Sequence, residues 1–96
     1  MMFLSLQARP SVAPLYRLQF EAAQDAWVLL YPEGMIKLNR SAGEIMQRCN
    51  GERSVQAIVT ELEQAFQTTG LQADVLAFVD MARAQRWLDI TPVVPA

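Results

Sequence analysis

The hydrophobic pattern of this 96-residue chain changes its period once, near Asn39. Before that point apolar residues alternate with polar ones or run together in short stretches, which is typical of β-strands. After it, apolar residues recur every three or four positions, as they do on one face of a helix. A run of strands followed by a run of helices predicts an α+β domain with an antiparallel sheet.

Three strands are predicted in the first part of the chain. The first covers 16–21, where apolar and polar residues alternate. The second covers 27–31, an unbroken apolar stretch that favours a central strand covered on both faces. The third covers 35–38 and follows the turn signal Tyr-Pro-Glu-Gly at 31–34, in which Pro presets φ and Gly accepts a positive φ. The sequence therefore predicts a small antiparallel sheet with a tight hairpin.

Three helices are predicted after the sheet. The first begins at a cap supplied by Asn39 or by Ser41, which has capping-box spacing, and it ends at Asn50-Gly51. The second begins after Ser54, and the third spans about 72–86. The third helix carries apolar residues beyond a single stripe, so it needs two surfaces to pack against. One of them is the core, and the other is either more core or a partner.

The stripes of the first two helices also predict the core. Its helical members are Ala42, Ile45, Met46, Cys49, Val55, Ile58, Val59, Leu62 and Phe66. Cys49 lies on an apolar stripe, and the chain has no histidine to activate it, so a buried core thiol is the favoured interpretation.

The predicted organisation is one winged-helix-like domain with short flanking segments. Residues 1–14 contain Pro10 and Pro14 without a clear period, which indicates an extended N-terminal arm that a partner would order. The winged-helix-like domain covers 15–90, and residues 91–96 form a tail. Three short helices beside a three-stranded antiparallel sheet are the basis of this assignment.

Composition excludes several classes of function. Hydrophobic residues make up 52% of the chain and charged residues 19%, which indicates a globular protein. A net charge of -2 argues against binding a phosphate backbone, because that affinity comes mainly from Lys and Arg. With one cysteine and no histidine, no metal site and no catalytic residue is predicted. The chain shows no signal peptide or membrane span, so a soluble cytoplasmic protein is expected.

Several short motifs occur together and in order along the chain. They are Pro-Glu-Gly-Met-Ile-Lys-Leu-Asn at 32–39, Cys-Asn-Gly at 49–51, Asp-Val at 74–75 and Trp-Leu at 87–88. With these motifs the chain resembles the PqqD family of pyrroloquinoline quinone (PQQ) biosynthesis, a group of precursor-peptide recognition elements, over roughly residues 8–90.

The resemblance implies a non-catalytic peptide chaperone. Such a protein would bind the precursor peptide PqqA and present it to PqqE, a radical S-adenosylmethionine enzyme. No cofactor is expected in this chain, since the iron–sulfur clusters belong to PqqE. One cysteine cannot hold a cluster that needs about four thiolates.

The resemblance also implies where the peptide binds. The peptide would add a strand to the edge of the third strand, in a groove against the third helix. The implied peptide-binding residues are Gly34, Met35, Ile36, Lys37 and Leu38 on the strand, and Val75, Phe78, Val79, Ala82, Arg83 and Arg86 on the helix. A further hypothesis is that Arg83 and Arg86, with Lys37, form a basic rim for an acidic leader peptide.

Other functions stay open at this stage. A winged-helix DNA-binding protein would need a basic recognition helix, but the second helix carries Glu61 and Glu63 and no Lys or Arg over 55–66. A carrier of PQQ or of an intermediate would need convergent polar groups, of which the sequence has few. The chain is expected to be a monomer, or a homodimer that exchanges its N-terminal arm.

Overall fold

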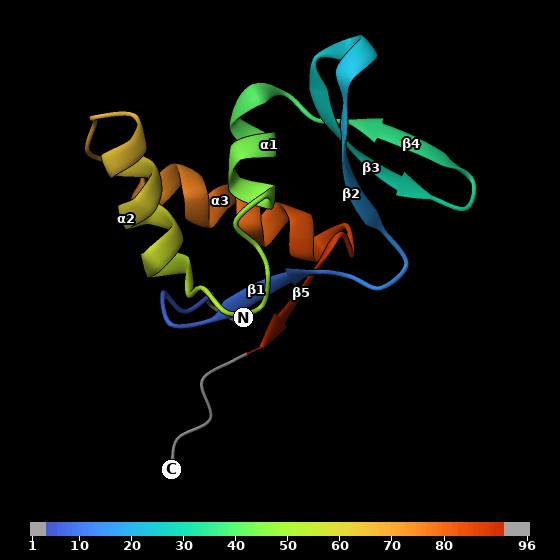
Figure 1. The fold of residues 1–96 in the computed structure, drawn as a ribbon. Coiled ribbons are helices and arrows are strands. Elements are labelled where there is room, and N and C mark those ends of the chain that lie inside the picture. Colours follow the sequence, from blue (N-terminus) through green and yellow to red (C-terminus); the bar gives the residue numbers. More distant parts are fainter. Residues whose placement is uncertain (1–3, 92–96) are drawn as a thin grey trace.

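The computed structural model describes residues 4–91 (Figure 1). Strands β2 (Arg17–Glu21), β3 (Ala26–Tyr31) and β4 (Gly34–Lys37) form an antiparallel sheet in the order β2-β3-β4. A short 3-10 helix, η1 (Ala22–Gln24), connects β2 to β3. Tyr31 pairs directly with Gly34 across the β3–β4 turn, so the predicted hairpin is confirmed.

Helices α1 (Arg40–Met46), α2 (Val55–Ala65) and α3 (Gln72–Ala84) follow the sheet. Asn39 is the cap of α1, because its side chain accepts a hydrogen bond of 2.8 Å from the backbone nitrogen of Ala42. Ser41 is therefore not the cap. The α1 helix also ends at Met46, before the Asn-Gly stop that the sequence suggested.

The predicted cap of the second helix and the order of the other two helices agree with the structure. Ser54 accepts a hydrogen bond of 3.0 Å from the backbone nitrogen of Ala57 and so begins α2. The α3 helix has no side-chain cap of its own. Instead, a carboxylate oxygen of Glu63 accepts a hydrogen bond of 3.1 Å from the backbone nitrogen of Leu71.

A second, two-stranded sheet joins the two ends of the chain. Strand β1 (Arg9–Val12) pairs antiparallel with β5 (Leu88–Thr91). Most of the segment predicted as an arm over 1–14 thus folds onto the domain, with β5 as its partner. The start of that arm at 1–3, and the predicted tail beyond Thr91, lie outside the described residues.

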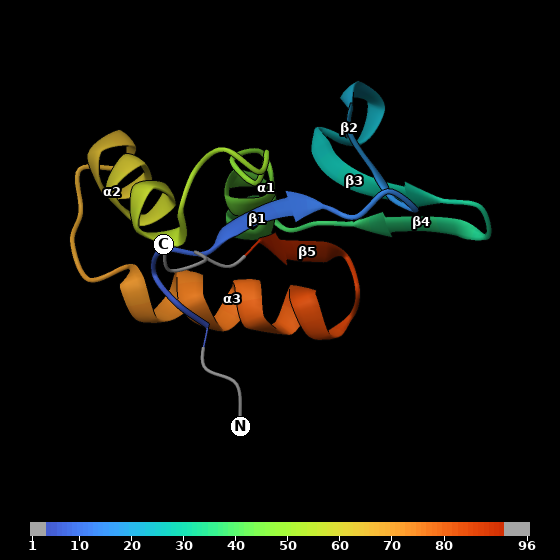
Figure 2. The ribbon, with the colours of Figure 1, turned by 90° about the horizontal axis from the view of Figure 1, so that it is seen from below.

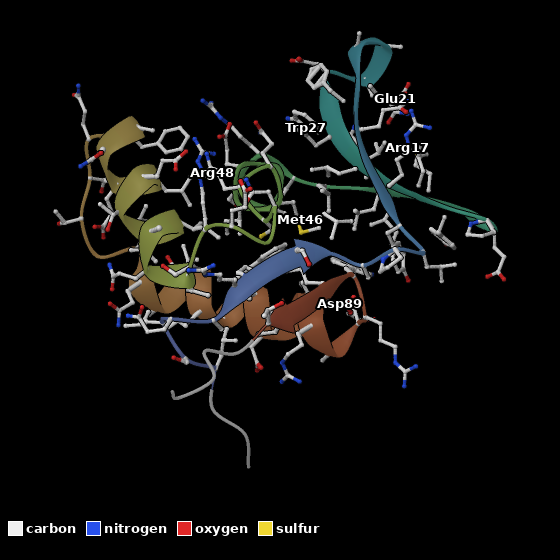
Figure 3. All side chains as sticks on the ribbon, turned by 60° about the horizontal axis from the view of Figure 1, so that its bottom comes forward. Arg17, Glu21, Trp27, Met46, Arg48 and Asp89 are labelled. Carbon is white, nitrogen blue, oxygen red and sulfur yellow. The ribbon has the colours of Figure 1, made fainter. Side chains whose placement is uncertain are left out.

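The core lies where the helices meet β3. Figure 3 shows Met46 pointing into this interior and Arg48 lying between α1 and α2. The α1 helix approaches β3 closely because Gly43 has no side chain: a Cβ atom there would lie 3.1 Å from Cδ1 of Trp27. Of the core residues predicted on the first two helices, Phe66 alone is exposed, at 43%.

A network of ion pairs fixes the segment between α1 and α2. The guanidinium of Arg48 lies 3.0 Å from a carboxylate oxygen of Glu44 and 3.0 Å from one of Glu61. Glu61 also binds Arg53, at 2.8 Å. Glu61 is therefore a structural residue that ties α2 to the preceding loop.

The observed order of sheet and helices confirms the predicted winged-helix-like α+β fold. In Figure 2, α3 lies along one side of the molecule, next to β5, and the β3–β4 hairpin extends away from α2. Between residues 4 and 91, no helix has the length and apolar character needed to cross a bilayer.

Candidate functional site

The outer edge of β4 is the first feature of the candidate site. Among residues 4–91, β4 pairs only with β3, so one side of its backbone faces away from the sheet (Figure 1). The backbone nitrogen of Leu38 donates to the carbonyl of Trp27 at 2.9 Å, which fixes the alternation of the ladder. In an antiparallel pair every second residue points its backbone groups outward. Met35 and Lys37 therefore hold the free N–H and C=O groups.

The side chains of β4 alternate in the same way. Ile36 is half-buried and packs against the core, and the following Leu38 is buried. Met35 and Lys37 are exposed on the other face, Met35 at 45%. A second chain along this edge would meet four backbone hydrogen-bonding groups and one exposed thioether side chain.

A hollow begins where β4 ends. We call it the helix hollow, because α1, α2 and α3 all line it. Its volume is about 770 Å³, and its lining includes Asn39 and Arg40, which directly follow the strand segment 34–38. The apolar side chains that line it are Ile45, Leu62, Phe66, Leu71, Val75 and Phe78.

The rim of the helix hollow carries both signs of charge. The guanidinium of Arg40 lies 5.8 Å from the ring centroid of Phe66, and both residues line the hollow. Glu44 and Asp74 are the acidic residues that line the hollow. A site of this kind fits an apolar side chain flanked by polar groups of a peptide.

The implied residues of α3 fall into two groups. Val75, Val79 and Ala82 are almost fully buried and belong to the core. Their main effect is to hold α3 in place, although Val75 also lines the helix hollow. Phe78 is half-buried and lines the hollow, which leaves it accessible to a bound chain.

Arg83 and Arg86 lie elsewhere. Both line a separate cleft beside β5, and Arg83 forms an ion pair with Asp80. The structure therefore places Phe78 and Val75 near the end of β4 and does not place the two arginines with them. Lys37 and Arg40 are the cations that lie on β4 and just after it.

Of the twelve residues that line the helix hollow, only Val75 and Phe78 were predicted as site residues from the sequence. The other ten include Asn39, Arg40 and Phe66. Arg40 carried no signal of its own, Asn39 was predicted only as a cap, and Phe66 was assigned to the core. One signal that could have found Phe66 is its position one residue beyond the end of α2, where a helical stripe runs past the core.

Within residues 4–91, no group of three His, Cys, Asp or Glu side chains is placed to hold a metal ion. The Cys49 thiol is buried, and burial raises its pKa to about 12, so it is a thiol rather than a thiolate near neutral pH. This agrees with the core position predicted for Cys49.

The fold and the open strand edge define a small winged-helix-like α+β domain suited to holding an extended chain. Comparison with known proteins then identifies the family. The family described as "Coenzyme PQQ synthesis protein D (PqqD)" matches residues 26–88, and the chain belongs to this family.

Individual relatives agree with the assignment. A "PqqA binding protein" from Pseudomonas aeruginosa is 49% identical over 87 residues, which is 90% of this chain and 95% of the relative. One of the same name from Azotobacter vinelandii is 44% identical over 82 residues, covering 84% and 89% of the two chains.

A solved structure also matches. The solution NMR structure of the PqqD truncation of Methylobacterium extorquens PqqCD has a TM-score of 0.69 and 26% identity, over 83% of this chain and 87% of that chain. That protein is described as a functional, stand-alone recognition element for ribosomally synthesised and post-translationally modified peptides.

Proposed function

We propose that this chain binds the precursor peptide PqqA by strand addition to β4 and presents it to the radical S-adenosylmethionine enzyme PqqE, without catalysing a reaction itself. The observation that carries the proposal is the open edge of β4, with the helix hollow at its end. The family and the names of the relatives supply the identity of the peptide.

Strand addition explains how one site can hold a flexible peptide in a defined register. Two outward N–H groups and two outward C=O groups, from Met35 and Lys37, give the peptide main-chain hydrogen bonds. The helix hollow then takes an apolar side chain beyond the paired segment, which fixes the register. The basic side chains of Lys37 and Arg40 would favour acidic residues in the same peptide.

A role as a presenter suits a chain that lacks reactive groups along the site. The residues that line β4 and the helix hollow supply no cysteine or histidine. The bound peptide would keep the rest of its chain free for the enzyme. The cytoplasm is the proposed location, because a single buried thiol suits a reducing compartment.

The test is a titration of the isotope-labelled chain with synthetic PqqA, followed by NMR. We expect shifts at residues 34–40 and at Phe66 and Phe78, with few at β1. Met35→Pro removes one outward N–H from the edge and should weaken binding by at least about tenfold, because a lost main-chain hydrogen bond and a blocked edge act together.

Two matched variants separate the backbone from the side chain. Met35→Ala loses the same thioether and keeps the N–H, so it should bind more tightly than Met35→Pro. Phe20→Pro makes the equivalent backbone change on the outer edge of β2. It should bind PqqA as tightly as Phe20→Ala does. Equal binding by Met35→Pro and Met35→Ala would rule out strand addition at β4.

A further inference from the structure

A second cleft lies between the N-terminal segment and the end of α3. We call it the arm cleft; it is lined by residues within 4–16 and 83–90 and has a volume of about 690 Å³. Its apolar lining includes Leu15, Leu88 and Ile90. Leu15 is 63% exposed, more than any other large apolar side chain over residues 4–91. A contiguous apolar surface of this kind, rather than a single exposed residue, is typical of a contact site.

The arm cleft is separate from the peptide site. It shares no lining residue with the helix hollow, and no residue of β4 lines it. Asp89, one of its lining residues, lies on β5 at a distance from the part of the larger sheet that carries Glu21 and Trp27 (Figure 3). The two sites therefore have no lining residue in common.

The charge at the mouth of the arm cleft is mainly positive. Arg83 and Arg86 line it together with the single carboxylate of Asp89. Arg83 is paired with Asp80, whereas Arg86 is exposed and has no ion pair with any residue from 4 to 91. The complementary partner is an apolar segment that carries a carboxylate.

The backbone of Arg86 has an uncommon conformation at the end of α3. Its φ is +66°, in the left-handed region that favours glycine. Trp87 donates to the carbonyl of Ala82 at 2.9 Å across this residue, so Arg86 occupies the position after a helix where glycine is usual. Arg86→Gly therefore removes the side chain without adding backbone strain.

We propose that the arm cleft docks an apolar, acidic segment of the enzyme that receives the bound peptide, with Arg86 pairing to its carboxylate. This rests on the proposed function, since a presenter must contact peptide and enzyme at once. A peptide bound as proposed above, along β4 and in the helix hollow, would contact no residue that lines the arm cleft, which leaves the cleft to the enzyme.

The α2 helix supplies a matched control. Gln67 has a φ of +51°, and Thr68 donates to the carbonyl of Glu63 at 3.0 Å across it, as Trp87 does across Arg86. Glycine at either position relieves the same backbone strain, so Arg86→Gly and Gln67→Gly should both keep or raise the melting temperature. Gln67 does not line the arm cleft.

The experiment measures the affinity of the full chain for purified PqqE and, separately, for synthetic PqqA. We expect Arg86→Glu and Leu15→Ser each to weaken PqqE binding by at least about tenfold, which is the order expected for a charge pair or an anchoring side chain at an interface. Arg86→Gly should weaken it as well, with no loss of melting temperature. PqqA affinity should stay within about twofold for all three, since the sites are separate. Gln67→Gly should change neither affinity.

Other results overturn the inference. Unchanged PqqE binding by Arg86→Glu and Leu15→Ser would remove the cleft from the interface. Loss of PqqA binding in the same variants would assign the cleft to the peptide, and a changed sedimentation mass would assign it to a second copy of the chain. A wild-type chain that binds PqqA but not PqqE would overturn this inference and the presentation step of the proposed function, and would leave peptide binding at β4 standing. Failure to bind PqqA would overturn peptide binding itself.

Discussion

Strands β1 and β4 are equally short, but their backbones are used in opposite ways. The β1 strand is bonded on both sides, and β5 pairs along one of them. On the other side, the carbonyl of Pro10 accepts a hydrogen bond of 2.9 Å from the backbone nitrogen of Gly51. Just before the strand, the carbonyl of Ala8 accepts one of 2.9 Å from Val55. Among the described residues β4 is bonded only to β3. The hydrogen-bonding capacity of β1 is thus used in folding, while half of that of β4 remains for another chain.

The outer edge of β2 sharpens this comparison. It is also unpaired in residues 4–91, but it carries Arg17 and Glu21, and charges on an edge strand discourage pairing with other chains. β4 has a single charge, on Lys37, and it leads into an apolar hollow. Under the proposed strand addition, the neighbouring surface therefore favours the edge of β4 over that of β2.

The largest expected effect comes from the same substitution placed in each strand. The backbone nitrogen of Ala13 donates to the carbonyl of Trp87, and in an antiparallel pair every second residue bonds to the same neighbour. The N–H of Ser11 therefore points at β5. Ser11→Pro should therefore lower the free energy of unfolding by about 3 kcal/mol, or prevent folding, whereas Met35→Pro should cost less than about 1 kcal/mol. Urea denaturation followed by circular dichroism measures both. Equal losses would show that folding depends on the backbone of β4 as strongly as on that of β1.

The next effect concerns two equally exposed apolar side chains. Phe66 and Met81 are 43% and 40% exposed, but only Phe66 lines the helix hollow. Phe66→Ala should weaken PqqA binding by about tenfold because the apolar contact in the hollow is lost, and Met81→Ala should leave it unchanged. Calorimetric titration of both variants measures this. A larger effect from Met81→Ala would place the peptide over the outer face of α3 instead.

Local signals explain why the hairpin was predictable and the small sheet was not. The β3–β4 turn depends on four adjacent residues at 31–34, and the α1 and α2 stripes depend on neighbours one turn apart. The β1–β5 pair joins the two ends of the chain, with Val12 opposite Leu88. A period in β1 could not be recognised, because Pro10 interrupts it and both of its sides are covered by other segments.

The candidate site was predictable to a similar extent. The edge position of β4 follows from its place as the last strand before the helices. Periodicity also placed Val75, Val79 and Ala82 on one stripe of α3, but it cannot tell a stripe that faces the core from one that faces a ligand. The helix hollow needs the relative positions of three helices, which no single stretch of sequence contains.

A smaller effect tests what holds the segment that bonds to the other side of β1 and to the residues before it. Gly51 donates to Pro10 on β1, and Val55 and Gln56 donate to residues that precede β1. Glu61 binds Arg48 and Arg53, which lie on either side of Gly51 in the chain. Glu61→Gln keeps the shape and removes the charge, so the free energy of unfolding should fall by about 1 kcal/mol, because Glu61 is partly exposed to solvent. The difference from wild type should shrink as salt is added. Glu52→Gln, which is exposed, is the control.

The smallest effect is a pH dependence that originates in the same segment. Cys49 directly precedes the residues that bond to β1, and burial raises the pKa of its thiol from 9.0 to about 12. Between these values the unfolded chain releases the thiol proton and the folded chain keeps it, so this contribution to stability is complete below pH 9 and is lost as the pH rises toward 12.

Between about pH 8 and about pH 9.5 the wild type should lose somewhat under ~1 kcal/mol more stability than Cys49→Ala. Urea denaturation at a series of pH values measures the two slopes. Parallel slopes, or rapid labelling of the native thiol by a disulfide reagent near neutral pH, would mean that the segment beside β1 opens readily. The contrast between a closed β1 and an open β4 would then fail.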